Sequence, residues 1–288
     1  MIRLYLLGYK GYEVFKNIDA PFFAVISDIV VGKDAGVIND FYKEIIDLCN
    51  DRNIMHYDRN QEPQNSNDFI IVIGWRWLIK SEKLIIVIHD SILPRLRGFN
   101  PLVTALINGD LEIGATGLFA SNYYDRGDII IQKKQTINYP IKIKKAVEII
   151  SAIYVKIVNE IIGLIIKNEG IDATAQFEDE VTYSLWRDED DYIIDWTKSS
   201  HEILRFINAV GYPYRGAKTR LVNQDLRIFD AEIVDEVIID NRMPGKVIFK
   251  DNYGIVIVCG HGLLRVKHLF MEDLSELDLR NKFRLKLG

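Results

Sequence analysis

Six short runs of apolar, largely β-branched residues constrain the first 135 residues of the chain more than any other feature. They are residues 3–8 (RLYLLG), 22–31 (FFAVISDIVV), 68–75 (DFIIVIGW), 83–91 (KLIIVIHDS), 113–121 (IGATGLFAS) and 128–134 (DIIIQKK). Continuous apolar runs of this length suit strands that are buried on both faces of a mainly parallel sheet. Stretches with helical periodicity separate them, at 37–53 and 100–109, and such alternation is typical of βαβ units. The sequence therefore predicts an α/β fold with a mainly parallel, Rossmann-like sheet and flanking helices.

The chain changes character twice beyond residue 141. Residues 142–170 carry a wide apolar face with helical periodicity and end on Gly170, which predicts a long helix packed on the sheet. A polar, acidic stretch comes next, and residues 194–211 then predict one more helix with Ser/Thr capping signals. The remainder consists of short strands joined by Asn- and Gly-containing turns, as expected for a smaller OB-like β-barrel. We predict a larger domain at 1–170, a linker at 171–191 and a C-terminal domain, a helix plus the β-rich part, at 192–288.

The net charge of the chain argues against a nucleic-acid partner. Its formal value is −5, so the protein as a whole gains nothing electrostatically from binding nucleic acid or an anionic membrane. The charge is uneven, because residues 197–288 carry a local +3 and residues 1–196 carry −8. We interpret the small basic excess as a solvated surface rather than a stripe that binds nucleic acid.

The apolar runs and the cysteine count indicate a cytoplasmic protein without a membrane partner. No run reaches the roughly 18 to 20 residues that a membrane helix needs. The first 15 residues carry no small-residue cleavage site of a secretory signal. Cys49 and Cys259 lie far apart, so neither a disulfide framework nor a cysteine-based metal cluster is supported, which fits a reducing compartment. The histidines show no zinc-ligand spacing, so no metal is expected.

Three polar segments come directly after predicted strands. They are residues 89–98 (HDSILPRLRG), 122–129 (NYYDRGDI) and 74–79 (GWRWLI). Ligands of open α/β sheets collect at the carboxyl ends of the strands. We therefore expect the three segments to face one cleft.

The ordered set IGW, IHDSILPRLRG, NPLVTALINGD, IGATGLFA and YDRGDII resembles the N10-formyltetrahydrofolate-dependent formyltransferase family. It matches that family's H-x-S-L-L-P-x-x-R-G and D-x-G-D/P-I-I signatures, and the pair is far more specific than either half. The C-terminal segments IDW, VGYPYRGAKTRL and MPGKVI are similar to the barrel domain of methionyl-tRNA formyltransferases. The resemblance thus covers most of the chain and places catalysis in residues 1–170.

The resemblance implies that a primary amine attacks the formyl carbon of the folate. The attacking nitrogen must lose a proton and the folate nitrogen must gain one. His89 suits this exchange, because an unperturbed imidazole titrates near pH 6.5. Asp125 is expected to orient His89 or a relay water and to stabilise the imidazolium. The alternatives are a histidine that anchors a loop and an aspartate that closes an Asx-turn, with Asp128 completing the turn.

The same resemblance implies N10-formyltetrahydrofolate as co-substrate, with no metal. The segment expected to line the pterin pocket, largely through backbone groups and together with Asp125, consists of Trp75, Arg76, Trp77, Leu78 and Ile79. A flat heterocycle needs apolar walls and a few fixed hydrogen bonds, which such a strand end supplies. The alternative is that the two tryptophans simply fill a core.

A further set of residues is expected to shape or bind the acceptor substrate. Arg95 and Arg97, as exposed basic residues, suit a phosphate, with a solvated loop as the alternative. Tyr9 and Lys10 come after the first strand in Gly8-Tyr9-Lys10-Gly11 and are also expected near phosphate, although this stretch is neither G-x-G-x-x-G nor a Walker loop.

One position departs from the family pattern. The family has Asn-x-His, in which the Asn carboxamide helps to hold the formyl oxygen, and this chain has Val87 there. Side chains at i and i+2 of a strand share a face, so Val87 should occupy the place of that amide and offers no donor. The loss of one oxyanion donor costs about 2.7 to 4 kcal/mol in the barrier. Asn122, Ser91 or backbone N–H groups are candidate replacements, and impaired catalysis is the other interpretation.

The acceptor is predicted from the residues directly after the first signature. Family members that formylate transfer RNA usually carry a basic insertion there, whereas this chain passes directly from Gly98 to Phe99. It is more similar to the branch that formylates nucleotide-linked, dideoxy amino sugars for surface polysaccharides such as O-antigen. We therefore predict a nucleotide sugar as the partner, and expect the C-terminal module to serve packing, homodimer formation or accessory binding. The alternatives are a methionyl-tRNA formyltransferase and a binding protein for folate or sugar nucleotide with impaired catalysis.

Overall fold

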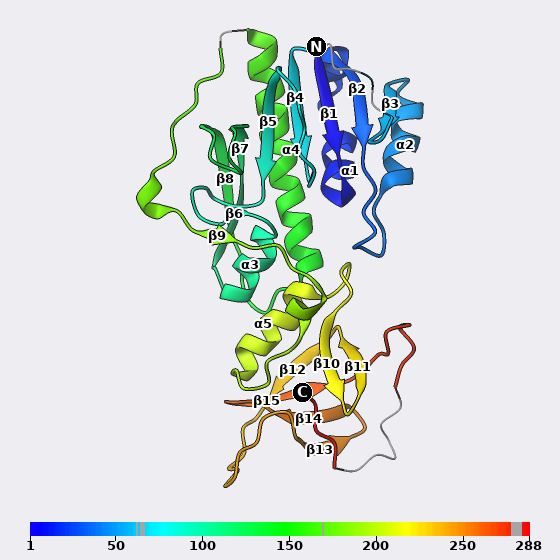
Figure 1. The fold of residues 1–288 in the computed structure, drawn as a ribbon, viewed down its shortest axis with the longest axis vertical. Coiled ribbons are helices and arrows are strands. Elements are labelled where there is room, and N and C mark those ends of the chain that lie inside the picture. The colour runs from blue at the N-terminus through cyan, green and yellow to red at the C-terminus, as the bar shows by residue number, and fades with distance from the viewer. Residues whose placement is uncertain (62, 64–66, 169, 278–283) are drawn as a thin grey trace. The chain divides into compact units, whose positions relative to one another are not determined.

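A computed structural model describes residues 1–61, 63, 67–168, 170–277 and 284–288, and these form two compact units (Figure 1). The first unit comprises Met1–Leu102, Leu111–Ile137 and Lys145–Leu185, and the second comprises Val103–Asp110, Asn138–Lys144 and Trp186–Gly288. Residues 171–185, within the predicted linker, thus group with the first unit. The predicted domain boundaries stay a prediction, and residues 169 and 278–283 of the predicted ranges lie outside the described residues.

A seven-stranded sheet forms the centre of the first unit, in the order β3-β2-β1-β4-β5-β7-β8. The strands are β1 (Ile2–Leu6), β2 (Ile26–Val31), β3 (Met55–Asp58), β4 (Phe69–Ile73), β5 (Leu84–His89), β7 (Glu112–Phe119) and β8 (Ile129–Thr136). The first five in this order run parallel, whereas β7 is antiparallel to β5 and β8 is antiparallel to β7. The predicted mainly parallel sheet is confirmed, and the six apolar runs form six of its seven strands.

The remaining elements surround or extend this sheet. They are α1 (Gly8–Lys16), η1 (Ala20–Val25), α2 (Tyr42–Asp51), the short strand β6 (Arg97–Gly98), α4 (Ile143–Lys167), η2 (Glu178–Glu180) and the short strand β9 (Tyr183–Ser184). The sequence patterns missed α1 and β3. Helix α1 begins at Gly8, has φ +68° there, and contains Gly11, at which an added Cβ would lie 3.1 Å from the Cβ of Leu6. Glycines weaken a helical pattern, and here one permits close packing on β1. Strand β3 has four residues and no buried one, so its pattern is weak.

Helix α4 is the core helix of the first unit. Its 25 residues are long and apolar enough to cross a membrane by length and composition alone, although Lys156 and Glu160 interrupt the apolar run. In the fold it packs on the sheet, because the hydroxyl oxygen of Tyr154 lies 2.8 Å from the main-chain oxygen of Ile88 in β5. A Cβ added at Gly117 in β7 would meet Ile157 and Ile161 of the same helix. The long apolar face that the sequence predicts for this helix therefore covers β5 and β7.

The second unit contains helices and antiparallel sheets, as expected for a β-rich C-terminal domain. Its elements are most of α3 (Pro101–Asn108), η3 (Glu189–Tyr192), α5 (Ser200–Val210), β10 (Ala217–Leu221), β11 (Gln224–Ile228), β12 (Ala231–Val234), β13 (Val247–Asp251), β14 (Gly254–Val258) and β15 (Leu263–Val266). One sheet has the order β12-β15-β14-β13, and β10 pairs with β11. The predicted capping signal of α5 is present, since Ser199 and Glu202 form a reciprocal capping box. Arg205 of α5 also donates to the main-chain oxygen of Ile107 at 3.1 Å.

Two glycines of the first unit give opposite expectations for replacement by alanine. A Cβ at Gly127 would overlap the main-chain oxygen of Phe119, whereas a Cβ at Gly163, inside α4, would lie 3.7 Å from the ring of Phe22. We expect Gly127→Ala to lower the free energy of unfolding by about 2 kcal/mol or more, because backbone must move. We expect Gly163→Ala to be neutral or to stabilise by up to about 1 kcal/mol. Urea unfolding of both variants tests this. A Gly127→Ala protein as stable as the unmodified one would contradict the close approach of Gly127 to the main-chain oxygen of Phe119.

Candidate active site

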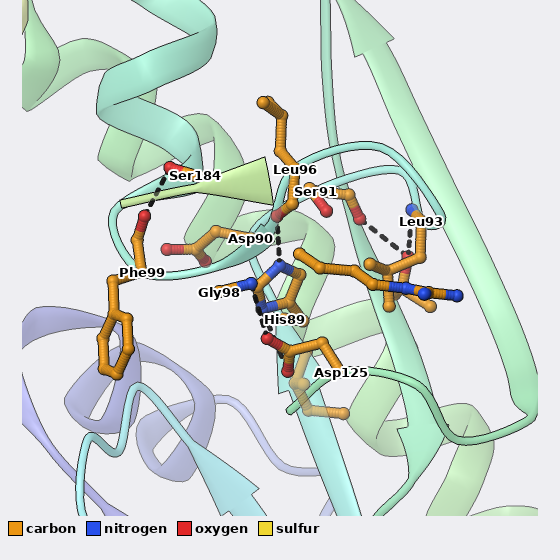
Figure 2. Close-up of polar contacts among 12 residues, drawn as sticks. His89, Asp90, Ser91, Leu93, Leu96, Gly98, Phe99, Asp125 and Ser184 are labelled. Carbon is orange, nitrogen blue, oxygen red and sulfur yellow. Dashed lines mark hydrogen bonds and ion pairs between the residues drawn. The ribbon is translucent and has the colours of Figure 1, made fainter. Parts of the chain in front are cut away.

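His89 lies at the carboxyl end of β5 and is buried. Its Nε2 lies 2.9 Å from the main-chain oxygen of Leu96 (Figure 2). Because a carbonyl oxygen only accepts hydrogen bonds, Nε2 carries a hydrogen and donates it. In the neutral ring the lone pair is then on Nδ1. That nitrogen faces the carboxylate of Asp125.

Asp125 links the imidazole to a second loop. Its Oδ1 lies 3.5 Å from Nδ1 of His89, and its Oδ2 accepts a hydrogen bond of 2.9 Å from the main-chain nitrogen of Gly98. Both residues that face the ring, Leu96 at φ +60° and Asp125 at φ +54°, have left-handed backbone. A left-handed backbone costs free energy in a residue other than glycine, and it persists only where contacts with the surrounding structure stabilise it. The sequence prediction that His89 and Asp125 come together is thus matched by the geometry.

A segment that the sequence presents as a linker contributes to this site. The main-chain nitrogen of Leu96 donates to Oγ1 of Thr182 at 2.9 Å, and β6 pairs in parallel with β9. The main-chain nitrogen of Phe99 donates to the main-chain oxygen of Ser184 at 2.9 Å, and the Ser184 hydroxyl donates back to Phe99 (Figure 2). Residues 174–184, here named the strap, therefore hold the loop whose carbonyl binds His89. No apolar or motif signal marks the strap, since its contacts are made by polar side chains and backbone.

The expectation that Arg97 is an exposed cation for a phosphate is wrong. Its side chain is completely buried. Its Nε and Nη2 donate to Oε1 of Gln176 at 3.0 and 2.8 Å, and Nη1 and Nη2 donate to the Glu178 carboxylate at 3.2 and 2.9 Å. Burial alone would lower the pKa of the guanidinium, but the hydrogen bond and charge of Glu178 raise that pKa above its usual value. The cation is therefore satisfied inside the protein, and the strap supplies its partners.

Ser91 supports a loop rather than presenting its hydroxyl as a free donor. It is buried, and its Oγ donates to the main-chain oxygen of Arg95 at 2.7 Å. A hydroxyl has one hydrogen, so this bond leaves none for an oxyanion. The main-chain oxygen of Ser91 accepts from Oγ1 of Thr116 at 2.7 Å, which ties the same turn to β7.

Lys10, predicted to contact substrate, is paired with a carboxylate next to His89. Its Nζ donates to Oδ2 of Asp90, and the hydroxyl of Tyr154 lies 2.5 Å from Oδ1 of the same residue. Burial would raise the pKa of Asp90, but the charge and hydrogen bond of Lys10, with the Tyr154 hydroxyl, hold that pKa below its usual value. The pKa of Tyr154 is raised well above its usual value by burial and by Asp90. The ion pair connects α1, and the Tyr154 hydroxyl connects α4, to the residue that follows β5.

An apolar face of the sheet leads up to His89. Its buried members are Tyr5, Val30, Ile70 and Val72, and the half-buried side chains packed against them are Trp75, Ile79, Ile85 and Val87. The ring centroids of Trp75 and Trp77 are 5.0 Å apart in an edge-on arrangement. Leu78 is exposed, and Arg76 pairs with Asp34. The two tryptophans therefore pack against each other, and Trp75 packs against the core, as expected if they fill a core. Trp75 also lies beside Val87 at the end of the strand.

Of the other predicted site residues, Tyr9 lies in helix α1, whereas Arg95 and Asn122 lie in loops. Tyr9 is half-buried, with its ring centroid 5.1 Å from that of Phe41, and burial raises the pKa of its hydroxyl. Asn122 and Arg95 are exposed. Their roles stay predictions. Among the residues that the structure describes, no group of three or more His, Cys, Asp or Glu side chains is placed to hold a metal ion.

Comparison with known proteins decides the family. The formyl transferase model matches residues 60–150, and the model of the formyl transferase C-terminal domain matches residues 187–285. The chain belongs to the formyl transferase family. It is an enzyme of formyl-group transfer.

Relatives of this formyl transferase include enzymes with different acceptors in their names. It is 29% identical over 231 residues to a methionyl-tRNA formyltransferase of Fusobacterium nucleatum, and the match covers 77% of this chain and 74% of the relative. The solved N-formyltransferase from Helicobacter canadensis, in complex with folinic acid and dTDP-3-aminofucose, has a TM-score of 0.66 at 18% identity, with 93% and 99% of the two chains covered. WlaRD, a sugar 3N-formyl transferase, has a TM-score of 0.65 at 20% identity, with 98% of each chain covered. HypX from Aquifex aeolicus has a TM-score of 0.64 at 18% identity, and this chain spans only 47% of it.

The ion pair beside the site gives this formyl transferase an expected pH dependence of stability. Since the pKa of Asp90 is lowered by folding, its contribution is fully present above the unfolded value of about 3.9 and is lost as the pH falls through the folded value. We expect Asp90→Asn to lower the free energy of unfolding by about 1 to 3 kcal/mol at pH 7, because it leaves the Lys10 ammonium without its counterion. The difference from the unmodified protein should narrow below about pH 3.9.

Urea unfolding at pH 7, 5 and 3.5 measures this difference. Asp68→Asn is the matched control, because Asp68 is an exposed carboxylate paired with the N-terminal amine. We expect little effect from the control. A difference for Asp90→Asn that does not change with pH would show that ionisation of this carboxylate does not stabilise the fold.

Proposed function

We propose that this protein transfers the formyl group of N10-formyltetrahydrofolate to the primary amine of a nucleotide-linked amino sugar. The observation that carries the chemical part is the pair of buried His89 and half-buried Asp125 at the carboxyl edge of the sheet. A proton that leaves the attacking nitrogen is accepted at Nδ1, since Nε2 is already committed to Leu96. The Asp125 carboxylate then stabilises the imidazolium.

The folate fits the apolar face beside His89. The members of this face that are only half-buried are apolar and aromatic, which suits a flat heterocycle with few polar contacts; they are Trp75, Ile79, Ile85 and Val87. When bound, the folate supplies the formyl carbon and takes the departing electron pair on its own nitrogen. The protein holds the folate and the amine next to each other, excludes water, and carries the proton of the attacking nitrogen to the folate nitrogen.

The choice of a sugar acceptor rests on three observations. Two similar solved structures name a sugar substrate or a sugar-nucleotide ligand, and both match this chain over nearly its whole length. The chain has no basic insertion between Gly98 and Phe99. Phe99 follows Gly98 and Tyr124 precedes Asp125; both are exposed, their ring centroids are 5.9 Å apart, and they offer aromatic faces to a sugar ring. A soluble, cytoplasmic enzyme that acts on nucleotide sugars for surface polysaccharide is consistent with this acceptor.

Methionyl-tRNA is the second candidate acceptor. Sequence relatives at 25–29% identity include methionyl-tRNA formyltransferases, and the C-terminal residues 197–288 carry a charge of +3. The third candidate is a homologue that binds folate or sugar nucleotide with impaired catalysis, because Val87 replaces the family's Asn.

A panel of acceptors distinguishes the three candidates. We expect release of tetrahydrofolate from N10-formyltetrahydrofolate with a dTDP-linked dideoxy-amino sugar and none with methionyl-tRNA. The reverse outcome would sink the sugar assignment. Folate binding without turnover on any acceptor would establish the impaired homologue.

Substitution of the paired residues tests the assigned chemistry. We expect His89→Ala and Asp125→Asn each to lower kcat by about 100- to 10,000-fold, because proton transfer loses its acceptor or its orientation. His201→Ala, at an exposed histidine of α5, is the control and should keep the rate. Near-normal turnover in either paired variant would refute its role.

Asn122 is the remaining side-chain candidate for the oxyanion donor, because the Ser91 hydrogen is taken and Val87 has none. We expect Asn122→Ala to lower kcat by about 100-fold, and Val87→Asn in that background to recover most of the loss. If Asn122→Ala stays within about threefold of the unmodified enzyme, backbone N–H groups must serve instead. Steady-state kinetics with saturating folate measures both variants.

A further inference from the structure

The side chain of Gln176, in the strap, hydrogen-bonds to both loops of the site, the loop that carries Asp125 and the loop that carries Leu96 and Arg97. The carboxamide of Gln176 is half-buried, and its Nε2 donates to the main-chain oxygens of Asp125 and Gly127 at 2.8 Å each. Its Oε1 accepts from Nε and Nη2 of Arg97 at 3.0 and 2.8 Å. A guanidinium only donates and carbonyl oxygens only accept, so this network fixes the orientation of the amide. Both donors and both acceptor positions of the carboxamide are therefore used.

The first pair of these bonds acts on the backbone that aims the Asp125 carboxylate. Asp125 has a left-handed φ of +54°, a conformation that surrounding contacts must enforce. Those contacts include the Gly98 nitrogen on the side chain and Gln176 on the main chain. The strap is also anchored just before Gln176, because Thr174 and Ile129 exchange two main-chain hydrogen bonds of 2.8 Å.

The second pair acts on the loop that holds the other ring nitrogen. Arg97 comes directly after Leu96, whose carbonyl accepts from Nε2 of His89. The buried guanidinium of Arg97 binds Gln176 and Glu178 and so cannot shift without leaving a charge unpaired. One carboxamide thus joins the loop before β8, which carries Asp125, to the loop after β5, which carries the Leu96 carbonyl.

We propose that Gln176 is a positioning residue of formyl transfer, which sets the Asp125 carboxylate against Nδ1 of His89. This role rests on the proposed function, in which His89 and Asp125 move the proton. Gln176 itself does not contact the reacting atoms. It acts through Asp125, because a misplacement of about 1 Å in a catalytic group costs about 100-fold in rate.

Gln176→Glu separates the two halves of the network. The new carboxylate still accepts from Arg97, whereas it turns an oxygen toward the main-chain oxygens of Asp125 and Gly127, where a donor is required. We expect kcat to fall about 10- to 100-fold while the KM values for folate and acceptor stay within about threefold. Gln176→Asn keeps the carboxamide but shortens its reach by one methylene, and we expect the same separation of kcat from KM. It serves as the second variant if Gln176→Glu does not fold, and Gln135→Glu, at an exposed glutamine of β8, is the matched control.

A double-mutant cycle with Asp125→Asn provides the decisive measurement. If Gln176 acts through the Asp125 carboxylate, Gln176→Glu should cost less than about threefold once that carboxylate is removed. A full 10- to 100-fold loss in both backgrounds would overturn the proposal and make Gln176 a structural residue only. Rates within threefold of the unmodified enzyme for both Gln176 variants, or a loss confined to KM, would overturn it as well. If Asp125→Asn itself keeps normal turnover, the proposed role of Asp125 fails, and that outcome differs from each of the others.

Discussion

The buried guanidinium of Arg97 is the constraint around which the site is arranged. A charge taken out of water must be met by partners in good geometry, or it costs several kcal/mol. Here those partners, Gln176 and Glu178, come from a segment 79 to 81 residues further along the chain. Bringing them to Arg97 also brings Thr182 and Ser184 to the backbone of the same loop. The loop is thereby fixed, and with it the carbonyl that selects the tautomer of His89.

Sequence patterns predicted the sheet well, because strands buried on both faces leave continuous apolar runs, and β-branched residues and flanking turn residues distinguish these from helices. They missed α1, because its two glycines weaken the helical pattern. They also missed β3, because none of its four residues is buried and the strand therefore has no apolar run. Whether β7 and β8 run parallel or antiparallel to their neighbours could not be predicted either, since an apolar run does not indicate the direction in which its strand pairs. Within the site, the motif pair predicted that His89 and Asp125 meet. It placed Arg97 in solvent because a lone arginine in a polar loop is usually exposed.

The strap shows why the rest of the site was not predictable. Residues 174–184 are polar and acidic, the composition of a linker, and their order comes from hydrogen bonds to residues far away in sequence. Such contacts leave no periodic trace. The only available hint was that an arginine beside a catalytic loop, if buried, would need an acid and an acceptor from elsewhere. The apolar face near Val87 was easier to predict, since the same runs that form the strands also supply its side chains.

The path of the strap has a consequence for dissection of the protein. A fragment that ended at residue 170 would contain His89 and Asp125 and would look like a complete catalytic domain in the sequence. It would lack both Gln176 and Glu178, which bind the Arg97 guanidinium, and the backbone groups of Leu96 and Phe99 that now bond to the strap would face solvent. Such a fragment would have its reactive groups but not their alignment. A minimal active piece must therefore extend through at least Ser184, and a cut in the acidic stretch should inactivate the enzyme without removing any residue of its chemistry.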